Sequence, residues 1–223
     1  MKLGLTLAVA ATAWFTIRSV RKSHAYQTPK SLIVIGDSQV KRHLGQAFKD
    51  QFSELDVKFF GKEGATHIEY LESPELQNAV RTLGCADLII IQLGDNGVSA
   101  NVKKVSEFVE LIKNQCPSAS IVWMGPMRAV NPTVNSYYVS EDPESPRYLP
   151  TYNRTRQIWD NRLRTALQNT DVQYISNFEL QSSQPVSSPF SNQRRGDGIH
   201  LTKDSADELA RLVRNQVLEN TRG

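Results

Sequence analysis

From residue 32 onward, short apolar runs alternate with longer segments of helical periodicity, and this alternation restricts the fold more than any other feature. The run 88–91 reads Leu-Ile-Ile-Ile, which is typical of a strand buried on both faces of a parallel sheet. Helices must then cross between strands and cover both faces. We predict one α/β domain over residues 30–220, a three-layer α/β/α sandwich with a mostly parallel sheet of about five strands. The expected strands are residues 32–35, 57–60, 88–93, 121–124 and 172–175, and the expected helices are residues 40–52, 68–82, 102–114, 152–168 and 203–217.

The charge of the chain is nearly balanced. Its 223 residues contain 26 Lys and Arg against 23 Asp and Glu, a net charge of +3. Residues 1–26 hold four of these cations and no acid, so the remainder carries 22 basic and 23 acidic side chains, or −1. A balanced body does not favour a nucleic-acid partner, which needs a basic surface.

Residues 1–25 form a hydrophobic signal or anchor segment. Residues 3–17 are uncharged, with one basic residue before them and three shortly after. This length fits a secretory signal better than a membrane span, which needs about 20 apolar residues, and residues 23–25 offer a cleavage site. We expect an exported or envelope-associated protein, periplasmic, extracellular or membrane-anchored. If the segment is retained, its cations favour a cytoplasmic domain, and residues 3–17 can contact a membrane or a partner assembly.

Two cysteines, Cys85 and Cys116, each precede an apolar run. Neither belongs to a zinc-binding spacing. If the runs are neighbouring strands, the two thiols can lie within reach of a disulfide, which an oxidising compartment would permit. Two separate, semi-buried thiols are the commoner arrangement, and we expect that one.

Two irregular stretches, residues 126–150 and 177–198, follow strands and carry several prolines. They should lie over the carboxyl edge of the sheet, where open α/β folds bind ligands. The first stretch holds Tyr137, Tyr138 and Tyr148, which we expect to contact substrate, for example by stacking on sugar rings.

The first predicted strand ends in Gly36, Asp37 and Ser38, directly before a helix. A serine at such a turn is presented above the sheet edge, with the positive end of the helix dipole behind it. The alternative is that Asp37 and Ser38 only cap the helix, a common use of both residue types.

Near the other end of the chain, Asp197 and His200 lie three residues apart before the last helix. A carboxylate beside an imidazole fixes its tautomer and stabilises the imidazolium, as in a Ser-His-Asp triad. The alternative is a turn with flanking glycines in which Asp197 or Thr202 caps the helix.

Two further positions offer hydrogen-bond donors for an oxyanion. Gly64 follows the second strand and can present a backbone N–H, and Asn96 follows the third strand and can present its amide. Both are also ordinary turn residues, and Asn-Gly at 96–97 is a turn dipeptide.

Together these positions share one edge of the predicted sheet, and here the sequence resembles the SGNH (GDSL-like) hydrolase family. Its blocks Gly-Asp-Ser, glycine, Gly-x-Asn and Asp-x-x-His are present in order, over residues 31–217. The family commonly has an acid directly after the asparagine, where this chain has Gly97. The resemblance implies a flavodoxin-like sheet and a carboxylic ester hydrolase that needs neither cofactor nor metal.

The implied mechanism is a covalent acyl-enzyme. Ser38 is the nucleophile, His200 its general base and Asp197 the residue that orients His200. The Ser38 and Gly64 N–H groups and the Asn96 side chain form the oxyanion hole. The substrate is a small-molecule or polysaccharide ester, with an O-acetyl group on a carbohydrate expected first.

Alternatives stay open at this point. The same site can serve an acyltransferase, a lipase or a thioesterase, and the domain can instead be a non-catalytic, carbohydrate-binding or structural component of a membrane or virion assembly. Arg194 and Arg195 precede the Asp197 turn. We expect the two arginines to be a solvated pair. The alternative is that they contact an anionic substrate, above all through Arg195. His67 is expected at the surface, at a helix start.

Overall fold

The computed structural model describes residues 29–99, 101, 103–134 and 136–221. The predicted signal or anchor segment, residues 1–25, lies outside this part of the chain. Among the helices in the described ranges, none combines the length and the apolar character that crossing a membrane requires.

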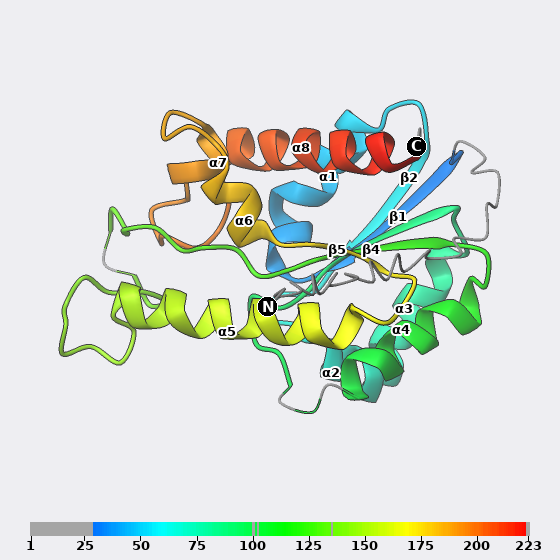
Figure 1. The fold of residues 1–223 in the computed structure, drawn as a ribbon, viewed down its shortest axis with the longest axis horizontal. Helices are drawn as coiled ribbons and strands as arrows, with labels where there is room; N and C mark the ends of the chain where they lie inside the picture. Colours follow the sequence, from blue (N-terminus) through cyan, green and yellow to red (C-terminus); the bar gives the residue numbers. More distant parts are fainter. Residues whose placement is uncertain (1–28, 100, 102, 135, 222–223) are drawn as a thin grey trace, which may run out of the picture.

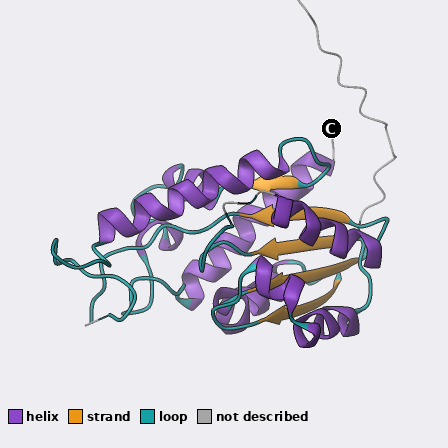
Figure 2. Ribbon diagram, turned by 90° about the horizontal axis from the view of Figure 1, so that it is seen from below, coloured by secondary structure: helices purple, strands orange, loops and turns teal. Residues whose placement is uncertain are grey.

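The centre of the molecule is a parallel sheet of five strands in the order β2-β1-β3-β4-β5, all of whose pairs are parallel. This confirms the predicted architecture, including the flavodoxin-like strand order. Figure 2 shows the strand arrows pointing to one side of the molecule, where long loops gather. The strands are β1 (Ser31–Gly36), β2 (Asp56–Gly61), β3 (Leu88–Gln92), β4 (Ser120–Met124) and β5 (Gln173–Ile175).

Helices cover both faces of the sheet, which gives the three layers seen in Figure 1. On one face lie α1 (Gly45–Gln51), α6 (Asn177–Ser182), α7 (Pro189–Asn192) and α8 (Lys203–Thr221). On the other face lie α2 (His67–Glu72), α3 (Pro74–Leu83), α4 (Lys103–Gln115) and α5 (Leu149–Leu167).

The strand residues alternate between the two layers of core. In β1, Leu32 and Val34 pack with α8, whereas Ile33 and Ile35 pack against the opposite helices. Successive side chains of a strand point to opposite faces, so a strand covered on both sides must be apolar throughout. The uninterrupted apolar runs seen in the sequence therefore have a direct structural cause.

The helices differ from the prediction at three places. The segment expected as one helix over residues 68–82 is two, because Ser73 caps α3 with its hydroxyl and Pro74 occupies the first turn. The first helical segment opens with a π-helical turn, η1 (Val40–Leu44), before α1. The stretch 177–198, expected to be irregular, contains α6 and α7, and α5 begins inside the stretch 126–150.

Cys85 and Cys116 form a disulfide, and the expectation of two separate thiols is wrong. The two residues precede β3 and β4, which are neighbours in the sheet, and their Cα atoms are 5.3 Å apart. That separation lies within the usual range for a disulfide. Cys116 is buried and Cys85 is exposed, so the bridge closes the amino edge of the sheet at the surface.

Candidate active site

Close packing sets the turn that presents Ser38. A side chain on Gly36 would place its Cβ 2.4 Å from a methyl group of Val40 and 2.7 Å from the Gln92 carbonyl oxygen. Only glycine allows the helix to start this close to the end of β1. Ser38 follows at the carboxyl edge of the sheet, and the residue is 7% exposed.

Ser38, His200 and Asp197 form one row of hydrogen bonds. The Oγ of Ser38 lies 3.0 Å from Nε2 of His200, and Nδ1 of His200 lies 2.7 Å from Oδ2 of Asp197. His200 is almost fully buried, at 3% exposure. The structure therefore brings Ser38 to the pair of Asp197 and His200, which lies more than 150 residues further along the sequence, in the order that a catalytic triad requires.

A tight turn fixes the pair Asp197 and His200. Gly198 has a positive φ of 76°, which favours glycine, and a Cβ there would lie 2.5 Å from the Val130 carbonyl oxygen. The Oδ1 of Asp197 accepts the backbone N–H groups of Ile199 and His200, both at 3.0 Å. The spacing of three residues thus lets one carboxylate hold the turn with Oδ1 and the imidazole with Oδ2.

Electrostatics keep Asp197 ionised. Burial alone would raise its pKa, but the hydrogen bond with His200 and the two backbone N–H groups hold the pKa of Asp197 below its ordinary value. An ionised carboxylate at Nδ1 keeps the proton of a neutral His200 on that nitrogen. Nε2 is then free to accept a proton from Ser38.

Gly64 lies in the turn after β2, next to the Ser38 helix start. Gly61, at the end of β2, sits against the backbone of Lys41 and Asp37, where a Cβ would approach within 2.4 and 2.7 Å. Glu63, directly before Gly64, forms an ion pair with Arg42 of η1, whose Nε lies 3.2 Å from its Oε1. Gly64 has a φ of 70°, and its N–H, like that of Ser38, donates to no acceptor in the described part of the chain.

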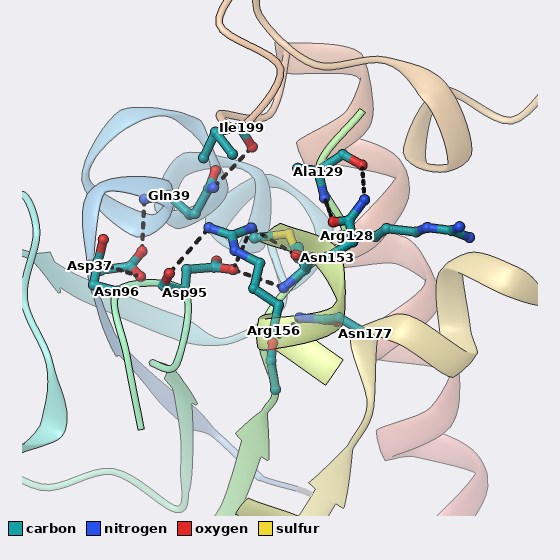
Figure 3. Close-up of polar contacts among 12 residues, drawn as sticks. Asp37, Gln39, Asp95, Asn96, Arg128, Ala129, Asn153, Arg156, Asn177 and Ile199 are labelled. Carbon is teal, nitrogen blue, oxygen red and sulfur yellow. Dashed lines mark hydrogen bonds and ion pairs between the residues drawn. The ribbon is translucent and has the colours of Figure 1, made fainter. Parts of the chain in front are cut away.

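The Asn96 side chain is already engaged. Its Nδ2 donates to Oδ2 of Asp37 at 3.1 Å (Figure 3). The same Nδ2 donates to the carbonyl oxygen of Ala65 at 3.2 Å. Asn96 therefore joins the turn of Ser38 to the turn of Gly64. Donation to an oxyanion would require one of these two hydrogen bonds to be shared or exchanged.

A buried charged network supports these turns, as Figure 3 shows. Nη1 of Arg156 lies 3.1 Å from Oδ1 of Asp95 and donates to the Met127 carbonyl oxygen at 2.7 Å. The same Asp95 carboxylate accepts the Met127 N–H at 2.8 Å. Burial, and then the nearby charge of Asp95, raise the pKa of Asp37. The ionisable side chains of Asp37, Asp95 and Arg156 at the carboxyl edge are thus almost completely buried.

Sequence reasoning did not identify Asp95 or Arg156. Asp95 directly precedes Asn96, and its carboxylate accepts the Met127 N–H and pairs with Arg156. Arg156 carried a usable signal, because it lies on the same helical face as Asp160, Leu163 and Leu167, all buried. A charged residue on a buried stripe indicates a buried partner.

Two of the three tyrosines lie beside the triad. The Tyr138 ring is 5.4 Å from the His200 ring, edge to face, and Tyr137 packs on Tyr138 in the same way. Their exposed fractions are 39% and 77%. The loop is tied to the triad turn by Ser136, whose hydroxyl donates to the Asp197 carbonyl oxygen at 2.7 Å.

Tyr148 is placed differently. It caps the start of α5 and pairs through its backbone with Ser140. Within the described residues, its ring packs on neither Tyr137 nor Tyr138. The Arg147 guanidinium, 4.3 Å above the Tyr137 ring, extends the exposed aromatic surface instead.

Arg194 and Arg195 are not a solvated pair. Arg194 is buried and donates to the carbonyl oxygens of Phe190, Gln193 and Arg128. Arg195 is exposed, and its backbone N–H donates to the His200 carbonyl oxygen at 2.6 Å. The pair splits because residue 194 is bridged to Leu201, which turns alternate side chains inward and outward.

His67 is fully buried, and its expected surface position is wrong. It starts α2 and packs edge to face against Trp123, and neither ring nitrogen has a hydrogen-bond partner in the described part of the chain. Burial lowers the pKa of His67 to about 4. Across the described ranges, no group of three or more His, Cys, Asp or Glu side chains is arranged to hold a metal ion.

Comparison with known proteins gives matches in structure only. No family model and no curated protein matches the sequence. Solved structures do match. A lipase/acylhydrolase from Enterococcus faecalis aligns at a TM-score of 0.57 and 14% identity, over 85% of this chain and 96% of that one.

Two further solved structures are similar. An acetylxylan esterase from Geobacillus stearothermophilus, in a catalytic mutant form, gives a TM-score of 0.55 at 13% identity, over 84% of this chain and 94% of that one. A protein described as an SGNH hydrolase from Slackia heliotrinireducens gives 0.60 at 15% identity, over 88% and 100%. The chain therefore has the fold of SGNH-like hydrolases over most of its length.

Proposed function

We propose that the protein is a carboxylic ester hydrolase in which Ser38 is the nucleophile. The observation that carries the proposal is the row of hydrogen bonds from Ser38 through His200 to Asp197 at the carboxyl edge of the sheet. A helix cap needs no imidazole at 3.0 Å from its hydroxyl, so capping does not account for this arrangement. The fold shared with lipase, acylhydrolase and esterase structures supports the same chemistry.

In the proposed reaction, His200 takes the proton of Ser38 as Oγ attacks the ester carbonyl. The Ser38 and Gly64 N–H groups receive the developing oxyanion, and Asn96 joins them by sharing a hydrogen bond now made to Asp37 or Ala65. His200 then protonates the leaving alcohol. Water, deprotonated by the same imidazole, releases the acid and frees Ser38.

For the substrate, we propose an O-acetyl group on a carbohydrate. Tyr138 packs against His200, from which the leaving alcohol would take its proton, and Tyr137 and Arg147 extend this exposed surface away from His200. Aromatic faces of this kind bury the apolar faces of sugar rings. One structural neighbour is named as an acetylxylan esterase.

We also propose that the protein works outside the reducing cytosol. A disulfide between Cys85 and Cys116 supports an oxidising compartment, and it agrees with the signal or anchor expected in residues 1–25. Cell fractionation with the intact mass of the mature protein tests this; full-length protein in the cytosol would contradict it.

The decisive experiment compares Ser38→Ala with Ser188→Ala. Both serines are 7% exposed, but Ser188 directly precedes α7, and within the described residues its hydroxyl hydrogen-bonds to none of Ser38, Asp197 and His200. Wild type and Ser188→Ala should be labelled by a fluorophosphonate and should hydrolyse acetate esters, whereas Ser38→Ala should do neither. Undiminished hydrolysis by Ser38→Ala would refute the proposal, and an unlabelled wild type would favour a binding role.

A substrate screen then separates the alternatives. Acetylated xylo-oligosaccharides, short-chain esters and long-chain esters are offered to wild type, with and without an added sugar acceptor. Preference for the acetylated sugar supports the proposed substrate. Preference for long acyl chains indicates a lipase, and acylated acceptor without free acetate indicates an acyltransferase.

A further inference from the structure

The residue after Ser38 is a glutamine whose side chain reaches the segment that carries His200. Gln39 is 2% exposed, and Figure 3 shows its amide extending to Ile199. Its Nε2 donates to the Ile199 carbonyl oxygen at 3.2 Å, and its Oε1 accepts the Leu201 N–H at 3.1 Å. The amide thus binds the backbone on both sides of His200.

This pairing uses the donor and the acceptor of the amide at once, as a neighbouring strand would. Ile199 and Leu201 are 4% and 1% exposed, so water cannot easily replace either hydrogen bond. A glutamate would lack the donor, a methionine would lack both groups, and an asparagine would be shorter by one methylene. The position is therefore chemically specific.

The backbone of Gln39 is tied equally firmly to the Ser38 turn. Its N–H donates to Oδ1 of Asp37 at 3.0 Å, and Asp37 is fully buried. Apart from the hydrogen bond with Ser38 itself, the polar contacts that His200 makes, with Asp197 and with the Arg195 N–H, come from within its own loop. They shape that loop but do not set its distance from Ser38.

We propose that Gln39 is a positioning residue that holds the His200 imidazole at hydrogen-bond distance from Ser38. The inference rests on the proposed function, since it concerns proton transfer between these two side chains. A misplacement of about 1 Å can lower a catalytic rate about 100-fold. Loss of the Gln39 amide should therefore slow the reaction of Ser38 and leave substrate binding unchanged.

Gln39→Met tests this, with Gln181→Met as the matched control. Gln181 is 5% exposed and makes the same kind of bridge, accepting the Arg128 N–H and donating to the Ser191 carbonyl oxygen. Each variant is assayed below its unfolding temperature for the rate of fluorophosphonate labelling and for kcat and KM on an acetate ester. We expect Gln39→Met to lower the labelling rate and kcat by about 10- to 100-fold, with KM within about twofold.

The control separates positioning from stability. Gln181→Met should lower Tm but keep labelling and kcat within about twofold of wild type, because its bridge touches no segment of the triad. If both variants slow the reaction equally, Gln39 only supports the fold and the inference is overturned.

Gln39→Glu gives a second, independent test, which remains available if Gln39→Met does not fold. The ionised carboxylate keeps the acceptor for the Leu201 N–H but faces the Ile199 carbonyl oxygen without a donor. Protonation restores that donor. The rate of this variant relative to wild type should therefore recover as pH is lowered, a dependence that a purely structural role would not produce.

The outcomes distinguish the two proposals. An unlabelled wild type overturns the proposed function and this inference with it. The inference alone is overturned if the wild type is labelled and folded Gln39→Met or Gln39→Glu reacts at the wild-type rate at every pH.

Discussion

At the amino edge of the sheet the polar contacts lie at the surface, whereas at the carboxyl edge they are buried. The carboxylate of Asp87 accepts hydrogen bonds from the N–H groups of Lys30 and Ser31 and from the Ser31 hydroxyl, all in an exposed position. The disulfide between Cys85 and Cys116 closes the same edge. These contacts join the beginnings of neighbouring strands.

The carboxyl edge is built in the opposite way. Asp37, Asp95 and Arg156 are each at most 4% exposed, and His200 is 3% exposed. Charges and imidazoles at this depth are costly unless each is paired, but they interact strongly once water is excluded. The difference between the two edges is that the amino edge makes its polar contacts where water is present, whereas the carboxyl edge holds the groups suited to chemistry where water is largely excluded. Substitution and pH should therefore affect the two edges differently.

The largest expected effect is on activity at the carboxyl edge. Asp197→Asn can still accept the Ile199 and His200 N–H groups, so the turn should keep its shape. It loses the charge that keeps the His200 proton on Nδ1, and we expect kcat to fall by about 10⁴-fold. Esterase kinetics with a thermal unfolding control measure this; a loss below tenfold would leave Asp197 without the proposed role.

The second prediction concerns the buried ion pair. Arg156→Met leaves Asp95 buried without its cation, which should lower the free energy of unfolding by about 3–5 kcal/mol. Arg154→Met, an exposed position on the same helix, should change it by less than about 0.5 kcal/mol. Denaturant unfolding of both variants gives the comparison. Equal effects would mean that burial of the pair has no special energetic role.

The third prediction moves to the amino edge. Replacing Cys85 and Cys116 by serine removes a bridge across a sequence separation of 31 residues and should lower the free energy of unfolding by about 3–4 kcal/mol. Because the bridge lies at the opposite edge from Ser38, esterase kcat in folded protein should stay at the wild-type value. A lower kcat at temperatures where the variant is fully folded would break the division between the two edges.

The smallest predicted effect is a pH dependence of stability. His67 is buried with a pKa of about 4, against about 6.5 in an unfolded chain. Folding lowers this pKa, so the unfolded chain binds a proton at residue 67 more readily than the folded protein does. The free energy of unfolding should therefore keep its full value above about pH 6.5 and should fall by about 3 kcal/mol as the pH is lowered toward 4. His67→Phe should remove this loss. Denaturant unfolding of both proteins between pH 7 and pH 4 measures the difference, and parallel curves would contradict the prediction.

Local patterns sufficed for most of the fold. The apolar runs predicted all five strands to within about two residues, because a strand covered on both faces is recognisable without knowing its partners. The short helices α6 and α7 escaped prediction, since four to six residues are too few for a helical period to be visible.

The candidate site divides in the same way. Ser38, Asp197 and His200 were predicted because parallel strands bring their turns to one edge of the sheet and because the motifs around them resemble those of a known family, although each turn alone also fits a helix cap. The burial of Arg194 and His67, the ion pair of Asp95 with Arg156 and the bridge made by Gln39 were missed. Each of these depends on contacts between segments far apart in the chain.

The sequence by itself determined the layers, the parallel sheet and the turns that carry the polar side chains, because periodicity and turn chemistry act over a few residues. Only the tertiary structure decided whether Ser38 faces His200, whether the two cysteines are joined and which charged side chains are removed from water. Each of these outcomes depends on contacts between segments far apart in the chain. At the carboxyl edge, for example, the amide of Gln39 and the guanidinium of Arg156 meet partners that no local pattern specifies.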